Sequence, residues 1–135
     1  MPMNGITRSR TLAALVLTGA AVLSAGAQAP AIKRTILQRA DLSAPGREAV
    51  LALAELPGGS EIPRHTHPGE EISYVLEGEL ILEIEGRPPL TLKAGDGFII
   101  EAGKPHGGRT LGTSPVKVVG TYVIHKGQPL ATPVN

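Results

Sequence analysis

The residues most suited to chemistry lie between residues 59 and 78, "GSEIPRHTHPGEEISYVLEG", where His65 and His67 are followed by Glu70 and Glu71. Side chains alternate between the two faces of a strand, so His65 and His67 should point the same way. We expect the next strand to pair antiparallel with the first, as a hairpin around the "PG" turn, and to bring Glu71 to the same point. Two neutral imidazoles and one carboxylate can hold a divalent first-row metal and leave coordination positions open.

Other residues extend or compete with this set. His106 follows a glycine-rich turn, "EAGKPH", and could supply a fourth ligand from a neighbouring strand. Glu70 is the competing carboxylate, but strand parity favours Glu71 and leaves Glu70 in solvent at the turn. His125 has no companion ligand nearby and is interpreted as a surface residue. A histidine pair alone is weak evidence because short motifs arise by chance, whereas histidines beside glycine and proline turns, with a carboxylate in reach, indicate a metal site.

The elements that must position these side chains read as strands. Short apolar or alternating runs are separated by Gly, Pro and Asp, and no stretch keeps a helical period. The predicted strands are 32–38, 47–56, 60–66, 71–77, 79–85, 89–93, 97–101, 106–111 and 116–125. Turn signals at this spacing predict an all-β sandwich or barrel. The tail from Lys126 is rich in proline and is expected to lie extended over the surface.

The same residues resemble the first motif of the cupins, small antiparallel jelly-roll β-barrels with a metal in the mouth. That motif is a glycine, H-x-H, a glutamate and a second glycine, and its spacing is met by Gly59, His65, His67, Glu71 and Gly78. The second motif is met in part, by Gly95, Gly103 and His106. Glu101 stands where the family has proline, and Thr110 where it has asparagine.

The resemblance implies an all-β, antiparallel jelly-roll β-barrel (cupin) with one divalent transition metal ion: Fe, Mn, Ni, Cu or Zn. It implies that His65, His67, Glu71 and His106 are the ligands, and this donor set does not choose among the metals. Losing the proline should leave the bend intact because Gly103 and Pro105 can form it. Thr110 changes an amide to a hydroxyl, which bears on the polarity of the pocket more than on metal binding.

Alternation from Glu71 also predicts the lining of the barrel. Ser73 and Val75 should face inward, whereas Tyr74 and Leu76 should face outward, toward a second layer or a dimer contact. Glu101 and Lys104 lie near the mouth, where charged turn residues are normally solvated. No general base is evident, so the catalytic residues are unknown at this stage.

Composition limits the partners. The chain of 135 residues fits one domain. Its formal net charge of +1, with the two signs interspersed, provides no basic face for nucleic acid. It contains no cysteine, which excludes disulfides, thiolate metal sites and a lipoprotein anchor and leaves histidine and carboxylate to bind a metal.

Residues 1–27 have the layout of a signal peptide: Arg8 and Arg10 without acids, the apolar run 11–23, and small residues at Ala25 and Ala27. The run falls short of the roughly 20 residues that span a bilayer, so no stable membrane anchor is expected. The twin-arginine signal is not matched because Ser9 separates the arginines. Cleavage after Ala27 is favoured over Ala29, which precedes Pro30. Residues 28–135 would then form a single cupin domain in the periplasm or outside the cell.

Two functions compete. The first is a metal-dependent enzyme, an oxygenase, isomerase or lyase, acting on a small polar molecule that binds the open metal positions. The alternative is a non-catalytic periplasmic module that binds a metal or small ligand, which the scarcity of acid–base groups favours. An inert scaffold is the weakest interpretation because the ligand set is intact. A homodimer is expected from family habit and from open strand edges, which proteins usually cover.

Overall fold

The computed structural model describes residues 31–135, which form strands and connecting turns and, within that range, no helix. The strands are β1 (Lys33–Asp41), β2 (Arg47–Leu56), β3 (Glu61–Thr66), β4 (Gly69–Glu77), β5 (Glu79–Ile84), β6 (Leu90–Lys93), β7 (Gly97–Ile100), β8 (His106–Thr110), β9 (Val116–His125) and β10 (Thr132–Pro133). All nine predicted runs are strands, and only the short β10 was not expected. The predicted signal peptide, residues 1–27, lies outside the described residues.

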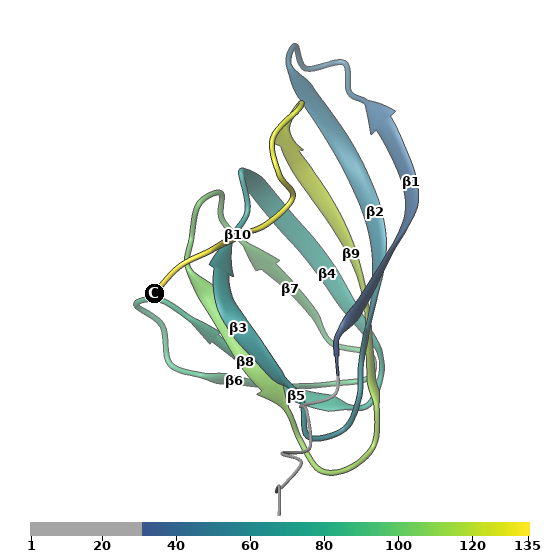
Figure 1. Cartoon of the computed structure of the whole chain (residues 1–135), viewed down its shortest axis with the longest axis vertical. Helices are drawn as coiled ribbons and strands as arrows, with labels where there is room; N and C mark the ends of the chain where they lie inside the picture. The colour runs from purple at the N-terminus through teal and green to yellow at the C-terminus, as the bar shows by residue number, and fades with distance from the viewer. Residues whose placement is uncertain (1–30) are drawn as a thin grey trace, which may run out of the picture.

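The strands form two antiparallel sheets of five, in the orders β1-β2-β9-β4-β7 and β10-β3-β8-β5-β6. Figure 1 shows the two sheets facing each other, with the C-terminal segment crossing to β3. This is the predicted all-β jelly roll. No helix in the described part of the chain is long and apolar enough to cross a membrane.

The space between the sheets is filled by the inward residues of alternating strands. In β9 every second residue from Val116 to Ile124 is buried, as a strand with one face on the core requires. The main core cluster consists of Leu56, Val75, Leu80, Leu82, Ile84, Leu92, Ile100, Val116 and Val118. Burying each such side chain stabilises the fold by about 1.5–3 kcal/mol, so these aliphatic residues hold the sheets together although aromatics are scarce.

A smaller cluster lies toward the histidines and contains Val50, Ala52, Tyr122 and Ile124, with Leu130 of the tail packed against it. Because the tail contributes to this cluster and pairs through β10 with β3, its path is fixed by packing as well as by hydrogen bonds. The sequence predicted an extended tail but not this contact.

The predicted hairpin between the two strands of the "HTHPGEE" segment is wrong. β3 pairs with β8 and β10, whereas β4 pairs with β9 and β7 in the opposite sheet. Gly69 is where β4 begins against β9, and a Cβ there would lie 1.8 Å from the Val123 carbonyl oxygen. The missing side chain lets the chain step directly from one sheet to the other.

The alternation predicted for β4 is confirmed. Ser73 and Val75 are buried, whereas Tyr74 and Leu76 are exposed on the outer face of the sheet. β3 and β4 belong to different sheets. The inward side chains of β4 therefore face the histidines of the motif from across the interior. The site is therefore assembled from both layers.

Candidate metal centre

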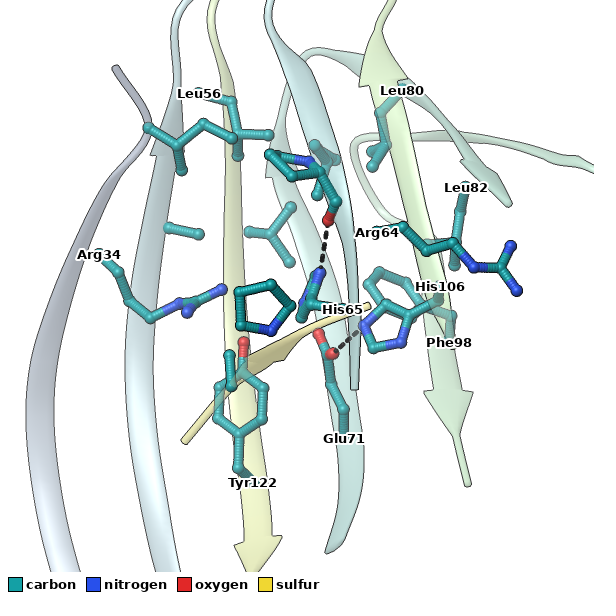
Figure 2. A pocket seen from close by; sticks show the side chains of 17 residues that line it. Arg34, Leu56, Arg64, His65, Glu71, Leu80, Leu82, Phe98, His106 and Tyr122 are labelled. Atoms are coloured by element: carbon teal, nitrogen blue, oxygen red, sulfur yellow. Dashed lines mark hydrogen bonds and ion pairs between the residues drawn. The ribbon is translucent and has the colours of Figure 1, made fainter. Parts of the chain in front are cut away.

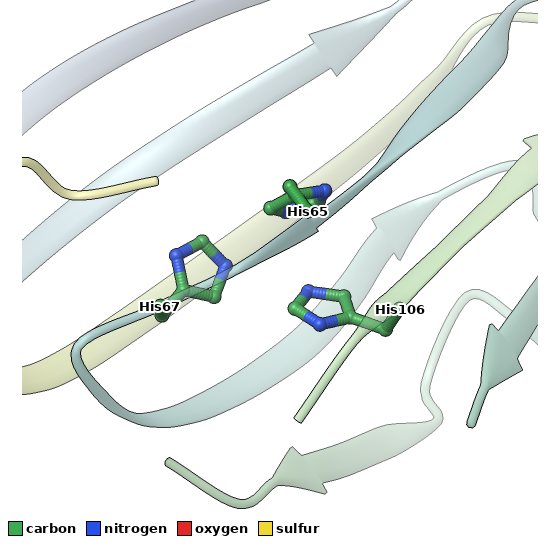
Figure 3. Close-up of side chains that lie close together, drawn as sticks. All are labelled: His65, His67 and His106. Atoms are coloured by element: carbon green, nitrogen blue, oxygen red, sulfur yellow. The ribbon is translucent and has the colours of Figure 1, made fainter. Parts of the chain in front are cut away.

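Three histidines converge at one end of the space between the sheets. His65 lies in β3, His67 follows the end of that strand, and His106 begins β8, directly opposite His65 in the register. One ring nitrogen from each histidine lies within 4.8 Å of the others. The rings of His65 and His106 are the nearest pair, with centroids 4.3 Å apart, and Figure 3 shows all three rings gathered around one point.

Glu71 reaches this point from β4 in the opposite sheet. Its Oε2 atom lies 3.1 Å from His67 Nε2 and 3.3 Å from His106 Nε2. Its other oxygen, Oε1, accepts a hydrogen bond of 2.7 Å from the Ser73 hydroxyl. The structure thus brings together all four residues that the sequence analysis proposed as ligands, and Ser73 orients the carboxylate.

Each imidazole is oriented by a backbone carbonyl at Nδ1. His65 Nδ1 lies 2.7 Å from the Pro63 oxygen, His106 Nδ1 lies 2.9 Å from the Lys104 oxygen, and His67 Nδ1 lies 2.5 Å from the Leu130 oxygen in the tail. A carbonyl can only accept, so each Nδ1 carries the proton and each neutral ring keeps a lone pair on Nε2. Such outer partners are typical of metal-binding histidines because they fix the tautomer and the ring.

The inner nitrogens provide the test of whether this site fits a metal. His67 Nε2 and His106 Nε2 are buried and have no hydrogen-bond partner among the described residues. With Nδ1 protonated, both present lone pairs toward Glu71 Oε2, so acceptors face an acceptor. A proton can bridge one histidine and the carboxylate at a time, whereas a divalent cation can bind all of these atoms together. The donor set therefore fits a transition metal.

The environment also favours the metal-binding protonation states. Burial opposes ionisation of Glu71, but the close polar contacts with His106 and His67 and the hydrogen bond from Ser73 outweigh it and hold the pKa of Glu71 below its usual range. Burial lowers the pKa of His65 to about 4, opposed by the Pro63 carbonyl and helped by the Arg34 cation and by any positive charge on the neighbouring His106 and His67. Glu71 is therefore anionic and His65 neutral at neutral pH, as metal ligands must be.

The centre opens into a cavity of about 340 Å³, near the lower end of the range for small-molecule pockets. Figure 2 shows the side chains that surround it. His65, Glu71 and His106 lie at its polar end, while most other walls are apolar, formed by Ile32, Ala54, Leu56, Leu80, Leu82, Phe98 and Val118 among others. A ligand there would meet the metal site at one end and hydrocarbon along its sides.

Sequence reasoning missed two polar residues of this cavity, Tyr122 and Arg34. The Tyr122 ring packs against His67 with centroids 4.7 Å apart, and the Arg34 guanidinium carbon lies 5.9 Å from the Tyr122 centroid. Burial, followed by the charge of Glu71, raises the pKa of Tyr122, so its hydroxyl stays protonated and can donate. Inward parity in β9 was the available signal for Tyr122, whereas Arg34 lies in an exposed strand with no such pattern.

The remaining residues singled out from the sequence lie away from the ligand cluster. Glu70 is half-buried, on the opposite face of β4 from Glu71, and His125 is exposed. Glu101 is exposed and forms an ion pair with Arg87. The half-buried Lys104 contributes its carbonyl to His106.

Thr110 is buried and accepts a 2.9 Å hydrogen bond from the Ser60 amide. The threonine that replaces the expected asparagine therefore ties β8 to the turn before β3. It is not among the residues that line the cavity.

A family model described as "Cupin domain" matches residues 52–125, more than half of the chain. The protein belongs to the cupin family, as its motifs, its two facing sheets and its histidine cluster indicate.

Two similar proteins show how far the likeness in sequence extends. The chain is 44% identical over 55 residues to the dimethylsulfoniopropionate lyase DddQ of Ruegeria pomeroyi, covering 41% of this chain and 27% of the lyase. It is 46% identical over 50 residues to the HTH-type transcriptional regulator PuuR of Escherichia coli, covering 37% of this chain and 26% of the regulator. The chain thus spans about a quarter of the length of these relatives.

The structures agree with the family. The crystal structure of DddQ matches with a TM-score of 0.59 and 29% identity, covering 64% of this chain and 43% of that one. An uncharacterized double-stranded β-helix protein of Klebsiella pneumoniae matches with a TM-score of 0.61 over 75% of this chain and 84% of its own. At 24% identity, that second likeness is one of fold alone.

Proposed function

We propose that this cupin holds one divalent transition metal ion through His65, His67, Glu71 and His106 and acts as a metal-dependent enzyme on a small polar molecule. The observation that carries the proposal is the pair of buried Nε2 atoms, of His67 and His106, that face Glu71 without a hydrogen-bond partner among the described residues. Fe, Mn, Ni, Cu and Zn all suit three imidazoles and a carboxylate.

A bound metal would supply Lewis acidity, polarising a carbonyl or carboxylate oxygen of the substrate. The protein's own residues hold and shield that site. Ser73 fixes Glu71, and the carbonyls of Pro63, Lys104 and Leu130 fix the imidazoles. The Tyr122 hydroxyl, kept protonated by burial, can donate a hydrogen bond to a substrate oxygen.

The reaction class is an oxygenase, isomerase or lyase. Similarity to a lyase, DddQ, over part of the chain supports the lyase class first. We further propose that residues 1–27 are a signal peptide and that residues 28–135 work in the periplasm or outside the cell, where the metal is acquired after export. The layout of the N-terminal residues supports this proposal.

A homodimer is a separate proposal. Ile72, Tyr74, Leu76 and Ile99 lie exposed on the outer faces of β4 and β7, and Ile72 pairs with Ile99 in the register. Exposed apolar residues grouped in this way are typical of interaction surfaces. Size-exclusion chromatography with light scattering should give the mass of two chains, and the mass of one chain would reject the dimer.

The second candidate function is a binding module without turnover. It is favoured by similarity to a transcriptional regulator, PuuR. It is also favoured by the lining of the cavity, where residues 31–135 place no histidine or carboxylate besides His65, Glu71 and His106. In that case the metal would bind a small molecule without converting it.

Metal occupancy tests the proposal. Elemental analysis should find about one transition metal per chain, and Glu71→Gln should lower this occupancy strongly because it removes the anionic ligand. Glu70→Gln is the matched control, since it removes the same charge one residue away and should keep the metal. Equal occupancy in both variants, or no metal in the folded wild type, would reject the site. Conversion of dimethylsulfoniopropionate that is lost in Glu71→Gln would favour the lyase over the binding module.

A further inference from the structure

The cavity has a second polar feature besides the metal centre. Arg34 projects from β1, the outermost strand of its sheet, and its guanidinium lies over the Tyr122 ring, 5.9 Å from the centroid. Figure 2 shows this side chain directed from β1 into the pocket, toward the side where the Tyr122 hydroxyl and Glu71 lie. The cation therefore faces the same space as the proposed metal.

Arg34 differs from the other arginine that lines the cavity. Arg64 forms an ion pair with Glu85. Arg39, Arg87 and Arg109 likewise form ion pairs with acidic residues. Arg34, by contrast, has no carboxylate within 4.0 Å among residues 31–135. A guanidinium carries a planar fork of N–H donors that matches the two oxygens of a carboxylate. In Arg34 this fork is available to a ligand.

The charges of the cavity point to an anionic ligand. A divalent cation beside the ionised Glu71 leaves one positive charge, and Arg34 adds another. The walls between them are apolar, with Ala54, Leu56 and Val118 on the side of the β1 sheet. A small anion would be attracted by both positive groups, more strongly at the buried metal end than at Arg34, which is exposed to water.

We propose that Arg34 is the specificity-determining residue of the pocket, and that the ligand is a small carboxylate. One carboxylate of the ligand pairs with Arg34, the hydrocarbon body lies against the apolar walls, and a second oxygen-bearing group reaches the metal. This proposal rests on the metal-dependent function proposed above, because the second group needs the metal. A neutral molecule of the same shape should bind more weakly, since it cannot form the paired charge-assisted hydrogen bonds with the guanidinium.

A purely structural role for Arg34, stacking on Tyr122, makes a different prediction. Such a cation–π contact would stabilise the fold but would not distinguish an anionic from a neutral ligand. The test must therefore compare ligands as well as variants.

The experiment measures binding by calorimetry with the dicarboxylate series from malonate to adipate and the diamides of the same lengths, using metal-loaded and metal-free protein. Arg34→Gln removes the cation, and Arg34→Lys restores the charge without the fork. Lys33→Gln is the matched control, since Lys33 is the adjacent cation, lies on the opposite face of β1 and pairs with Glu55 outside the cavity. Metal content is measured in every sample.

In the metal-loaded protein, the best dicarboxylate should bind about 10- to 100-fold more weakly to Arg34→Gln than to the wild type, as expected for losing a charge-assisted bidentate pair. Arg34→Lys should recover part of this affinity, Lys33→Gln should bind like the wild type, and the diamides should not discriminate among the variants. Equal dicarboxylate affinity in the wild type and Arg34→Gln, with metal present in both, would overturn the role of Arg34 and leave the metal site standing. Absence of metal from every sample would instead overturn the proposed function, while Arg34-dependent carboxylate binding by the metal-free protein would still support the anion site.

Discussion

Removal of the last seven residues, 129–135, should weaken metal binding although none of these residues is a proposed ligand. The truncation deletes the Leu130 carbonyl, which lies 2.5 Å from His67 Nδ1, and β10, which pairs with β3 at Thr66 and His65. It also removes the Leu130 side chain from the cluster that includes Tyr122. His67 would then lose the partner that fixes its tautomer and its ring.

The size of the effect follows from the contact that is lost. Deleting an outer hydrogen-bond partner of a metal-binding histidine typically costs 10- to 100-fold in metal affinity, or about 1.4–2.7 kcal/mol. Competition with a chromophoric chelator measures this affinity directly. The other two histidines keep their carbonyl partners at Pro63 and Lys104, so the site should be weakened but not abolished.

Two variants separate the carbonyl from the rest of the tail. Truncation after Thr132 keeps Leu130 and should bind metal within a few-fold of the full chain. Leu130→Ala keeps the backbone carbonyl while removing the side chain, so it should lower the free energy of unfolding more than it lowers metal affinity. If the protein ending at Gln128 binds metal as tightly as the full chain, the proposed role of the tail is refuted.

Three further predictions concern the fold and the electrostatics. Gly69→Ala should destabilise the protein by about 3 kcal/mol, because the added Cβ would lie 1.8 Å from the Val123 carbonyl oxygen. In the control Gly97→Ala the nearest contact of the added Cβ is 3.4 Å, so its free energy of unfolding should be within about 1 kcal/mol of the wild-type value. Equal denaturation midpoints for the two variants would contradict this prediction. Thr110→Val should cost about 0.5–1.5 kcal/mol by removing the buried hydrogen bond from the Ser60 amide, which keeps only its longer contact of 3.2 Å with the Pro57 carbonyl. Thr110→Ser should restore most of this stability, and both variants should keep normal metal content, so a loss of metal in Thr110→Val alone would place Thr110 in the site. In an NMR titration of the metal-free protein, His65 should gain its proton near pH 4. Because the pKa of His65 is lower in the folded than in the unfolded chain, the free energy of unfolding should fall as pH drops from 6.5 toward 4. A titration midpoint near pH 6.5 would show that burial does not lower the pKa of this ring.

Much of this architecture could be predicted because strands carry a local signal. Alternation correctly indicated the inward positions Ser73 and Val75 and the outward positions Tyr74 and Leu76. The same alternation placed His65 and His67 on one face, and the family motif supplied His106. Each of these inferences needs only neighbours in the sequence or a known spacing.

The features that were missed depend on contacts between distant segments. The hairpin prediction for β3 and β4 was wrong because a turn such as "HPG" does not record which sheet the next strand joins. The decisive feature is the close approach of Gly69 to Val123, which belongs to a strand far along the chain. The partner of His67 is the backbone carbonyl of Leu130. Every residue has a backbone carbonyl, so the amino-acid sequence does not indicate this contact. Arg34 was missed because its place in the cavity depends on its contact with Tyr122, which lies on another strand of the sheet.

X-ray absorption spectroscopy of the metal-loaded full chain would show whether His65, His67, Glu71 and His106 together bind one metal, as proposed. We expect about one metal per chain, with three imidazole nitrogens and at least one oxygen in its first coordination shell. His106→Ala should remove one imidazole from that shell. A shell made of oxygen alone, or one unchanged in His106→Ala, would show that these residues do not hold the metal.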